Sequence, residues 1–232
     1  MPAGLSSVLR RHRRGAVWTP ILLPNLVLWL PAPSITGLDN NDPVGTAWLD
    51  LSGNGYNATV VGGSPTYKTN QQNGLPGVSF DGNDEMKSVF TTLSQPFTVY
   101  WVGNTVWGGS AQVVFDSESC TSQSVIRRFS ATQYTITPPT DIFTSAADDN
   151  WHIVGGIWNG ASGSARFDGT AKAENTGTST LTSGLQIGAQ CNDASFQVGV
   201  TGEIVVTSDA ISADNITLLE HYFSAEWAIG AL

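Results

Sequence analysis

The carboxylates are the first residues to consider for chemistry, because glycoside hydrolysis divides the acid and nucleophile roles between two of them. Alternate residues of a strand face the same side, so two carboxylates two positions apart on one strand could face a cleft together. None of the glutamates, at positions 85, 118, 174, 203, 220 and 226, is followed two residues later by Asp. The nearest arrangement, Asp116-Ser117-Glu118, has the reverse order. The sequence therefore predicts a protein that is not an enzyme.

Other catalytic patterns are equally weak. His12, His152 and His221 do not cluster, and no Gly-x-Ser-x-Gly elbow occurs. Gly62-Gly63 and Gly108-Gly109 lack the lysine and the helix of a phosphate-binding loop.

A sugar-binding site is the better-supported chemistry, because lectin sites stack an aromatic ring on a sugar face and bind hydroxyls with amides and carboxylates. Trp107 lies in Val106-Trp107-Gly108-Gly109, and Trp158 precedes Asn159-Gly160, so both tryptophans stand beside turns. Trp107, Trp158 and Asn159 are the candidate glycan-binding residues, with burial in the core as the alternative for each tryptophan.

Two cysteines, Cys120 and Cys191, lie far apart and have no metal-ligand spacing. They are either joined in a single disulfide bridge or left as two free buried thiols. The cysteines therefore do not indicate whether the protein works in an oxidising or a reducing compartment.

The charge is unevenly distributed. Four arginines and no acidic residue precede Asp39, whereas the rest of the chain holds six basic and nineteen acidic residues, a formal −13. An acidic body argues against direct binding of nucleic acid or of an anionic membrane. No apolar run reaches the length of a membrane span. We expect residues 1–24 to form a basic arm that anchors the protein, with a solvated tail as the alternative. The anchoring residues would be Arg10, Arg11, Arg13, Arg14, Val17, Trp18, Ile21 and Leu22.

Residues 25–232 are expected to form one domain of short strands punctuated by Gly, Asn and Asp turns. Strands are predicted at 25–30, 57–61, 77–80, 96–103, 111–115, 124–129, 134–137, 151–158, 164–167, 184–188 and 196–207, with a loop-rich stretch at 62–76. The strand at 96–103 carries large residues on both faces, which indicates a central strand between two layers. A helix is predicted after Ser212 or Asp214 and before Gly230. Its apolar stripe, Ile216, Leu219, Phe223 and Trp227, would dock on the sandwich.

Several motifs, taken in order, resemble a known family. They are Leu26-Val27-Leu28-Trp29-Leu30, the segment from Trp48 to Ala58, the segment from Asn73 to Gly82, Trp151-His152-Ile153-Val154, Phe167-Asp168-Gly169, and the closing strands and helix up to Trp227. Over about residues 25–229, this order is similar to concanavalin A-like, laminin-G-like domains, of the variety found in bacteriophage structural proteins and bacterial surface proteins. The resemblance implies an all-β jelly-roll sandwich with an extended N-terminal arm and one C-terminal helix.

The resemblance also suggests functions. The glycan-cleaving members carry a Glu-x-Asp-x-x-Glu strand, which this chain lacks. Laminin-G-like domains often hold calcium at one rim, for which Asp116, Glu118 and Asp193 are the candidates, with solvated turn carboxylates as the alternative. No other cofactor is expected.

The first hypothesis is a non-enzymatic bacteriophage virion protein, such as a capsid decoration or fibre-associated protein. Its partners would be other capsid or tail proteins, and we expect a homo-oligomer, with a trimer by analogy to virion spikes. The alternative is a carbohydrate-binding adhesion module, extracellular or at the cell surface, that recognises a host glycan. Glycan hydrolysis ranks third.

Overall fold

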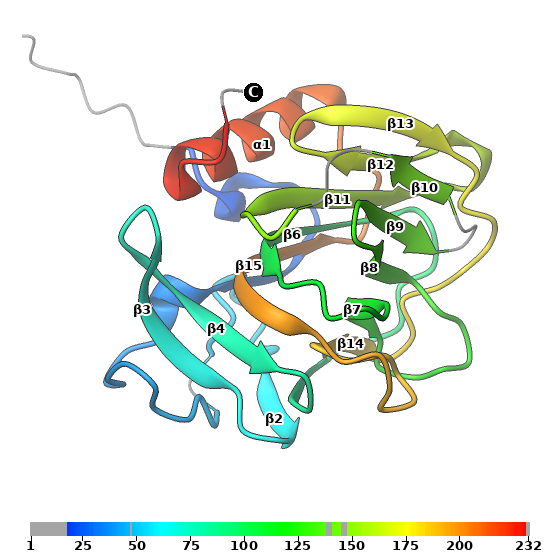
Figure 1. The fold of residues 1–232 in the computed structure, drawn as a ribbon. Helices are drawn as coiled ribbons and strands as arrows, with labels where there is room; N and C mark the ends of the chain where they lie inside the picture. The colour runs from blue at the N-terminus through cyan, green and yellow to red at the C-terminus, as the bar shows by residue number, and fades with distance from the viewer. Residues whose placement is uncertain (1–17, 47, 138–140, 145–147, 231–232) are drawn as a thin grey trace, which may run out of the picture.

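The computed structural model describes residues 18–46, 48–137, 141–144 and 148–230. Its strands form two antiparallel sheets packed face to face (Figure 1). The first sheet has the spatial order β13 (Thr170–Glu174), β12 (Gly163–Phe167), β11 (His152–Trp158), β6 (Phe97–Thr105), β15 (Val198–Thr207), β4 (Leu75–Asp81) and β3 (Thr66–Gln72), and β1 (Leu26–Pro31) also pairs with β15. The second has the order β10 (Asp141–Thr144), β9 (Gln133–Thr137), β8 (Val125–Ser130), β7 (Gln112–Ser117), β14 (Gly184–Ile187), β5 (Glu85–Val89) and β2 (Thr59–Gly62). This confirms the expected all-β sandwich.

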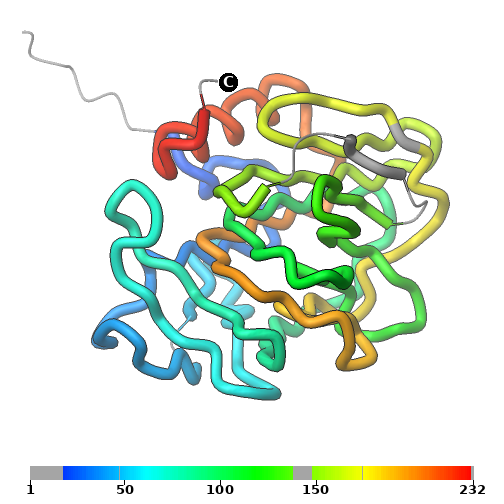
Figure 2. The backbone as a smooth tube through the Cα atoms, in the orientation of Figure 1, coloured from blue at the N-terminus to red at the C-terminus, as the bar shows by residue number. Residues whose placement is uncertain are grey.

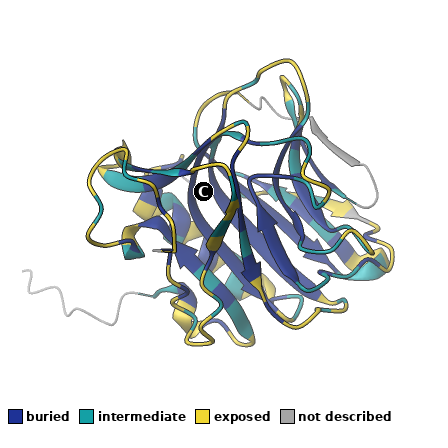
Figure 3. Cartoon of the chain, turned by 90° about the horizontal axis from the view of Figure 1, so that it is seen from below, coloured by how far each residue is buried: buried dark blue, intermediate teal, exposed yellow. Residues whose placement is uncertain are grey.

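Strand β6 lies at the centre of the first sheet, between β11 and β15, and separates two apolar layers. Val99 and Trp101 face the interior between the sheets, whereas Tyr100 and Val102 belong to a second cluster on the outer face. Because side chains alternate along a strand, a strand covered on both sides needs large residues at every position. The predicted central strand is thus confirmed. Figure 3 shows the same pattern, with buried residues along the strands and exposed residues in the loops.

The second layer is made by α1 (Ala213–Trp227), the one α-helix among the described residues. The Ser212 side chain accepts a hydrogen bond from the Asn215 amide and caps the helix, as predicted. Leu219, Phe223 and Trp227 are buried in the outer cluster, with Ile216 packed partly against it. The helix ends at Trp227, and Ala228 adopts the left-handed conformation that closes it, two residues before the predicted stop.

The described part of the N-terminal segment runs beside α1 (Figure 2). It contains the short 3-10 helix η1 (Pro20–Leu22), and Leu23 is buried in the outer cluster. Two further 3-10 turns, η2 (Ala32–Ser34) and η3 (Gly160–Ser162), lie in loops.

Strand β3 contradicts the prediction of a loop at residues 62–76. It pairs with β4 around a turn in which Asn73 and Gly74 both have positive φ, 50° and 77°. The sequence Thr-Tyr-Lys-Thr-Asn-Gln-Gln has no apolar alternation, because β3 lies at the sheet edge and only Tyr67 is buried. Residues 66–72 form a strand because they pair with β4, and their amino-acid composition does not indicate one. Strands β5, β10 and β13 were likewise not predicted.

Candidate functional site

The two tryptophans proposed as sugar platforms have different surroundings. Trp158 is fully buried and stacks on Phe97, with ring centroids 5.0 Å apart. The prediction that Trp158 binds a glycan is therefore wrong, because its indole fills the interior between the sheets. Trp107 is half-buried, and the Arg128 guanidinium carbon lies 5.7 Å from its ring centroid. Asn159 is also half-buried and lines a separate hollow with Gln95.

The suggested calcium residues are not assembled as ligands. Asp116 is fully buried, and its carboxylate accepts hydrogen bonds from the Ser117 and Cys191 amides at 2.7 and 3.1 Å. Burial raises the pKa of Asp116 to about 6. Glu118 pairs with Lys87 at 3.2 Å. Within the described ranges, no group of three or more His, Cys, Asp or Glu side chains is arranged to hold a metal ion. Asp116 and Glu118 are thus engaged by other groups of the protein and are not assembled with Asp193 as a ligand set, and calcium binding stays a prediction.

Of the proposed anchoring residues, Arg10, Arg11, Arg13, Arg14 and Val17 lie outside the described residues.

The three described anchoring residues lie near α1. Trp18 packs edge-on against Tyr222 of the same chain, with centroids 6.1 Å apart. Ile21 and Leu22 are 48% and 58% exposed, so their burial against a partner stays a prediction.

A cavity of about 510 Å³ opens where β3, β11, the β12–β13 turn and the end of α1 meet, and we call it the Trp151 cavity. Unlike the other hollows, it combines an indole, two amides and a carboxylate. Its lining residues are Gln72, Asn150, Trp151, His152, Asp168, Ala228, Ile229 and Gly230.

The half-buried Trp151 is held from behind by Trp227. Their rings stack with centroids 5.1 Å apart and planes 13° apart. The pair rests on Gly202 of β15, where an added Cβ would lie 2.7 Å from the Trp151 ring and 2.6 Å from that of Trp227. Glycine is needed here because any larger residue would displace the two indoles. The position of the Trp151 ring is thus determined by the sheet and the helix together.

The polar side of the cavity is organised by His152. Its Nδ1 lies 2.7 Å from Asp168 Oδ2 and its Nε2 lies 3.1 Å from Asp148 Oδ1. Asp168 also accepts a hydrogen bond from the Ile153 amide at 2.8 Å, and its φ of 42° lies in the predicted Asp-Gly turn. Asn150 donates to Asp148 at 2.6 Å. These contacts orient the Asp168 and Asn150 side chains before any ligand arrives.

A buried carboxylate lies behind the stacked tryptophans. Glu203 accepts hydrogen bonds from Trp29 Nε1 at 2.5 Å, Trp227 Nε1 at 2.9 Å and the Tyr222 hydroxyl at 3.2 Å. Burial raises the pKa of Glu203 to about 7 despite these three donors. Glu203 therefore joins β1, β15 and α1 behind the cavity.

Sequence reasoning did not select Trp151. It placed this residue inside a strand from 151 to 158, whereas β11 begins at His152. The available signal was its position after the polar Asp148-Asp149-Asn150 run, at the junction of loop and strand. Gln72 gave no signal, because its strand was not predicted.

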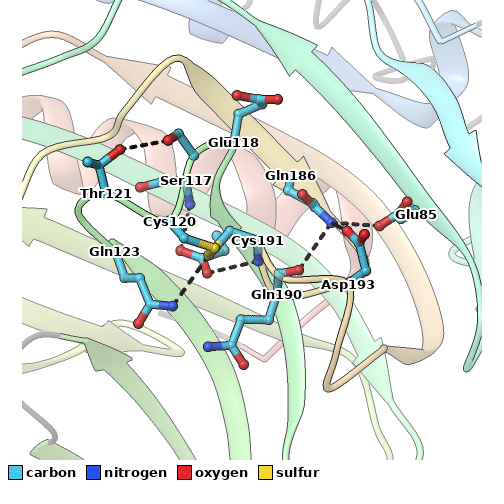
Figure 4. The surroundings of a disulfide bond; sticks show 12 residues. Glu85, Ser117, Glu118, Cys120, Thr121, Gln123, Gln186, Gln190, Cys191 and Asp193 are labelled. Carbon is cyan, nitrogen blue, oxygen red and sulfur yellow. Dashed lines mark hydrogen bonds between the residues drawn. A yellow bond between two sulfur atoms is a disulfide. The ribbon is translucent and has the colours of Figure 1, made fainter.

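The carboxylates of Glu85 and Asp193 lie near each other, beside the disulfide (Figure 4). Gln186 Nε2 donates to Glu85 at 2.6 Å and to Asp193 at 3.1 Å. Burial and the neighbouring Asp193 charge raise the pKa of Glu85. Neither carboxylate lines the Trp151 cavity.

Cys120 and Cys191 form a disulfide, which resolves the two alternatives left by the sequence. Gln123 Nε2 contacts Cys191 Sγ at 3.4 Å (Figure 4). The bridge attaches the loop after β7 to the loop after β14.

Among the described residues, no helix is long and apolar enough to cross a membrane.

Comparison with protein families found no matching family model, and comparison with curated proteins found no match. Solved structures do match. Domain 4 of AbnA, a GH43 extracellular arabinanase from Geobacillus stearothermophilus in complex with arabinotriose, has a TM-score of 0.63 at 11% identity, over 84% of this chain and 98% of that one. Trypanosoma rangeli sialidase in complex with sialic acid has a TM-score of 0.61 at 13% identity over 88% of this chain.

This chain spans only 34% of the sialidase. A GH54 arabinofuranosidase variant gives a TM-score of 0.59 at 14% identity, over 78% of this chain and 50% of that one. At these identities the likeness concerns the fold alone, an all-β sandwich of two antiparallel sheets.

Proposed function

We propose that this protein is a non-catalytic carbohydrate-binding module that recognises a surface glycan through the Trp151 cavity. The observation that carries the proposal is the half-buried indole of Trp151, held beside the Gln72 amide, the Asn150 amide and the Asp168 carboxylate. Ligand sites usually combine an apolar surface with a few placed polar groups. A sugar offers both complements, an apolar C–H face for the ring and hydroxyls for the amides and the carboxylate.

Preorganisation supports this function. Trp227 and Gly202 hold the indole, and His152 holds Asp168, so binding orders few side chains. A site that is rigid before binding loses less conformational entropy. The structural neighbours add support at the level of the fold, since they are glycosidases or glycosidase domains, one of them in complex with arabinotriose.

The absence of catalysis remains part of the proposal. Asp168 is already engaged by His152 and by the Ile153 amide. Such a carboxylate is suited to accepting a hydrogen bond from a sugar hydroxyl rather than to attacking an anomeric carbon.

The test is a titration of intrinsic tryptophan fluorescence with neutral and acidic oligosaccharides. We expect wild-type protein to respond to at least one of them, Gln72→Ala to keep the response with at least fivefold weaker affinity, and Trp151→Ala to lose the response. Trp107→Ala is the matched control, because it removes a half-buried indole elsewhere, and it should bind normally. A response lost in Trp107→Ala and kept in Trp151→Ala would move the site to Trp107, and no response to any saccharide would refute the function.

The Cys120–Cys191 bridge supports an extracellular or cell-surface location, because disulfides persist in oxidising environments. Labelling of intact cells with a membrane-impermeant reagent would test this location.

A second candidate function, a bacteriophage virion component, is supported by the charge distribution. Residues 1–38 hold four arginines and no acidic residue, whereas the rest of the chain is strongly acidic. A short basic arm suits attachment to acidic neighbours in an assembly, because arginine forms paired hydrogen bonds with carboxylates. The test is the copy number in purified particles of the full chain and of a chain lacking residues 1–20. A fixed copy number lost on truncation would favour this function, and absence from every particle would exclude it.

A further inference from the structure

Two open hollows outside the Trp151 cavity meet at Thr178, and we call them together the Thr178 groove. One, of about 440 Å³, is lined by Asn159 and Gln95 among others. The other, of about 470 Å³, is lined by Gln123 and Thr137 among others. Among the described residues, the lining contains amides, hydroxyls and backbone but no Asp, Glu, Lys, Arg or His. The chain holds nineteen acidic residues, and none that the structure describes lines these two hollows.

The first hollow has a rigid floor. Gln95 Nε2 donates to the carbonyls of Thr176 and Ser179, both at 3.0 Å, and its Oε1 accepts from the Gly160 amide at 2.5 Å. The fully buried Thr176 hydroxyl accepts a hydrogen bond from the backbone amide of Asn159 at 2.9 Å. All the hydrogen-bonding groups that build this floor are thus engaged with one another.

The second hollow is held by the disulfide and by one hydrogen bond between segments. Cys120 lines it and is bonded to Cys191. The Thr180 amide donates to Ser122 Oγ at 2.9 Å. Residues 120–123 are therefore attached both to the loop after β14 and to the segment that contains Thr178.

Several polar groups of the groove lack protein partners. The Thr137 hydroxyl is buried and has no hydrogen-bond partner among the described residues. The side chains of Asn159 and Thr178 also make no hydrogen bond to any described residue. The Gln123 side chain makes one, from its Nε2 to Cys191 Sγ, and its carbonyl oxygen makes none with the described residues. The Thr137 hydroxyl is enclosed and out of reach of a ligand, whereas Asn159 is half-buried and Thr178 is exposed, so a ligand hydroxyl can bond to these two side chains.

We propose that the Thr178 groove is a second carbohydrate subsite, which takes a neutral oligosaccharide along the two hollows. The choice of a carbohydrate rests on the proposed function, whereas the requirement for neutrality rests on the lining. A uronic or sialic acid would bring a carboxylate to a surface with no cation to pair with it. Sugar hydroxyls, in contrast, find both donors and acceptors in the side-chain amide of Asn159, the side-chain carbonyl oxygen of Gln123 and the Thr178 hydroxyl.

The experiment uses the full chain and three oligosaccharides, neutral arabinotriose, neutral cellotetraose and acidic trigalacturonic acid. The side-chain amide signals of Asn159 and Gln123 in ¹⁵N NMR spectra report on the groove, and tryptophan fluorescence reports on the Trp151 cavity. We expect a neutral sugar to shift both amide signals in wild type and in Trp151→Ala. Thr178→Val should weaken that binding at least fivefold without altering the fluorescence response.

Thr178→Val also separates a binding role from a structural one. Removing an exposed hydroxyl that bonds to no described residue should leave the melting temperature of the free protein unchanged, while weakening the binding of the sugar. Thr69→Val, an exposed threonine on β3, is the matched control and should bind as wild type. If neither neutral sugar shifts the amides while the fluorescence response persists, the groove proposal alone is overturned. If the amides shift and fluorescence is silent, the Trp151 proposal alone fails. Equal binding of trigalacturonic acid at the groove would also overturn the neutral assignment.

Discussion

At the residue scale, the tryptophans show how burial separates structural from binding roles. Trp158 and Trp107 both stand beside a glycine-containing turn in the sequence. In the structure, Trp158 lies between Phe97 and Phe115 and is fully buried, whereas Trp107 is half-buried under the Arg128 guanidinium. Replacing each tryptophan with alanine should therefore lower the stability of the protein by different amounts.

We expect Trp158→Ala to lower the free energy of unfolding by about 3–5 kcal/mol, because it removes a buried indole and leaves a cavity. Trp107→Ala should lower it by about 1 kcal/mol, the loss of a partly exposed cation–π contact. Guanidinium denaturation of both variants measures the difference. Similar losses in the two variants would contradict these burial assignments.

Glu203 should make stability depend on pH. Burial raises its folded-state pKa from 4.5 to about 7, so the folded protein holds this proton more tightly than the unfolded chain. The stabilisation is fully present below pH 4.5 and is lost as the pH rises through 7, with a magnitude on the order of 3 kcal/mol.

Chemical denaturation of wild type and Glu203→Gln between pH 4 and 8 measures this effect. The difference between the two curves isolates Glu203, because Asp116, whose pKa is also raised to about 6, titrates in both proteins. Parallel curves would show that Glu203 does not cause the dependence.

At the element scale, α1 is joined to the first sheet by a buried polar cluster as well as by its apolar stripe. Arg166 of β12 contacts both Glu220 oxygens, through Nη2 at 2.7 Å and through Nε. The fully buried Tyr100 hydroxyl donates to the same carboxylate at 2.9 Å. Glu220 is itself buried, so it depends on Arg166 for its charge partner.

Arg166→Ala should therefore destabilise the protein by about 3 kcal/mol, because it leaves a buried carboxylate without a cation. The triple variant Arg166→Met, Glu220→Leu, Tyr100→Phe removes the whole polar cluster and should recover most of that loss. Thermal unfolding of both variants tests this. A triple variant less stable than Arg166→Ala would mean that the ion pair itself is strongly stabilising.

At the scale of the whole molecule, the disulfide closes a long loop. Cys120 and Cys191 are 71 residues apart, and the segment between them includes β8, β9, β11 and β12. Cross-linking residues so far apart restricts the unfolded chain more than the folded one.

The double variant Cys120→Ser, Cys191→Ser should lose about 4 kcal/mol of stability on the chain-entropy estimate. The Trp151 cavity has no residue in the two bridged loops, so its fluorescence response should survive once the variant is folded. The Thr178 groove, which Cys120 lines, should bind more weakly. Equal loss of binding at both sites would mean that the bridge acts only through global stability.

Local sequence patterns were sufficient to predict the sandwich. Alternating large residues in β6 predicted a strand covered on both faces, and the Ser212 cap and the apolar stripe predicted α1. Asp168-Gly169 predicted a turn with positive φ. Periodicity and turn chemistry depend on near neighbours in the chain, so one sequence suffices to read them.

The residues that meet at a site could not be predicted from the sequence, because they are brought together by folding. The Trp151 cavity collects Gln72, Trp151, Asp168 and the end of α1 from separate parts of the chain. Gln72 comes from the edge strand β3, which has a polar sequence and forms because it pairs with β4. Tertiary packing likewise buried Trp158 and joined the two cysteines. These outcomes depend on contacts between residues distant in sequence, which composition and periodicity do not encode.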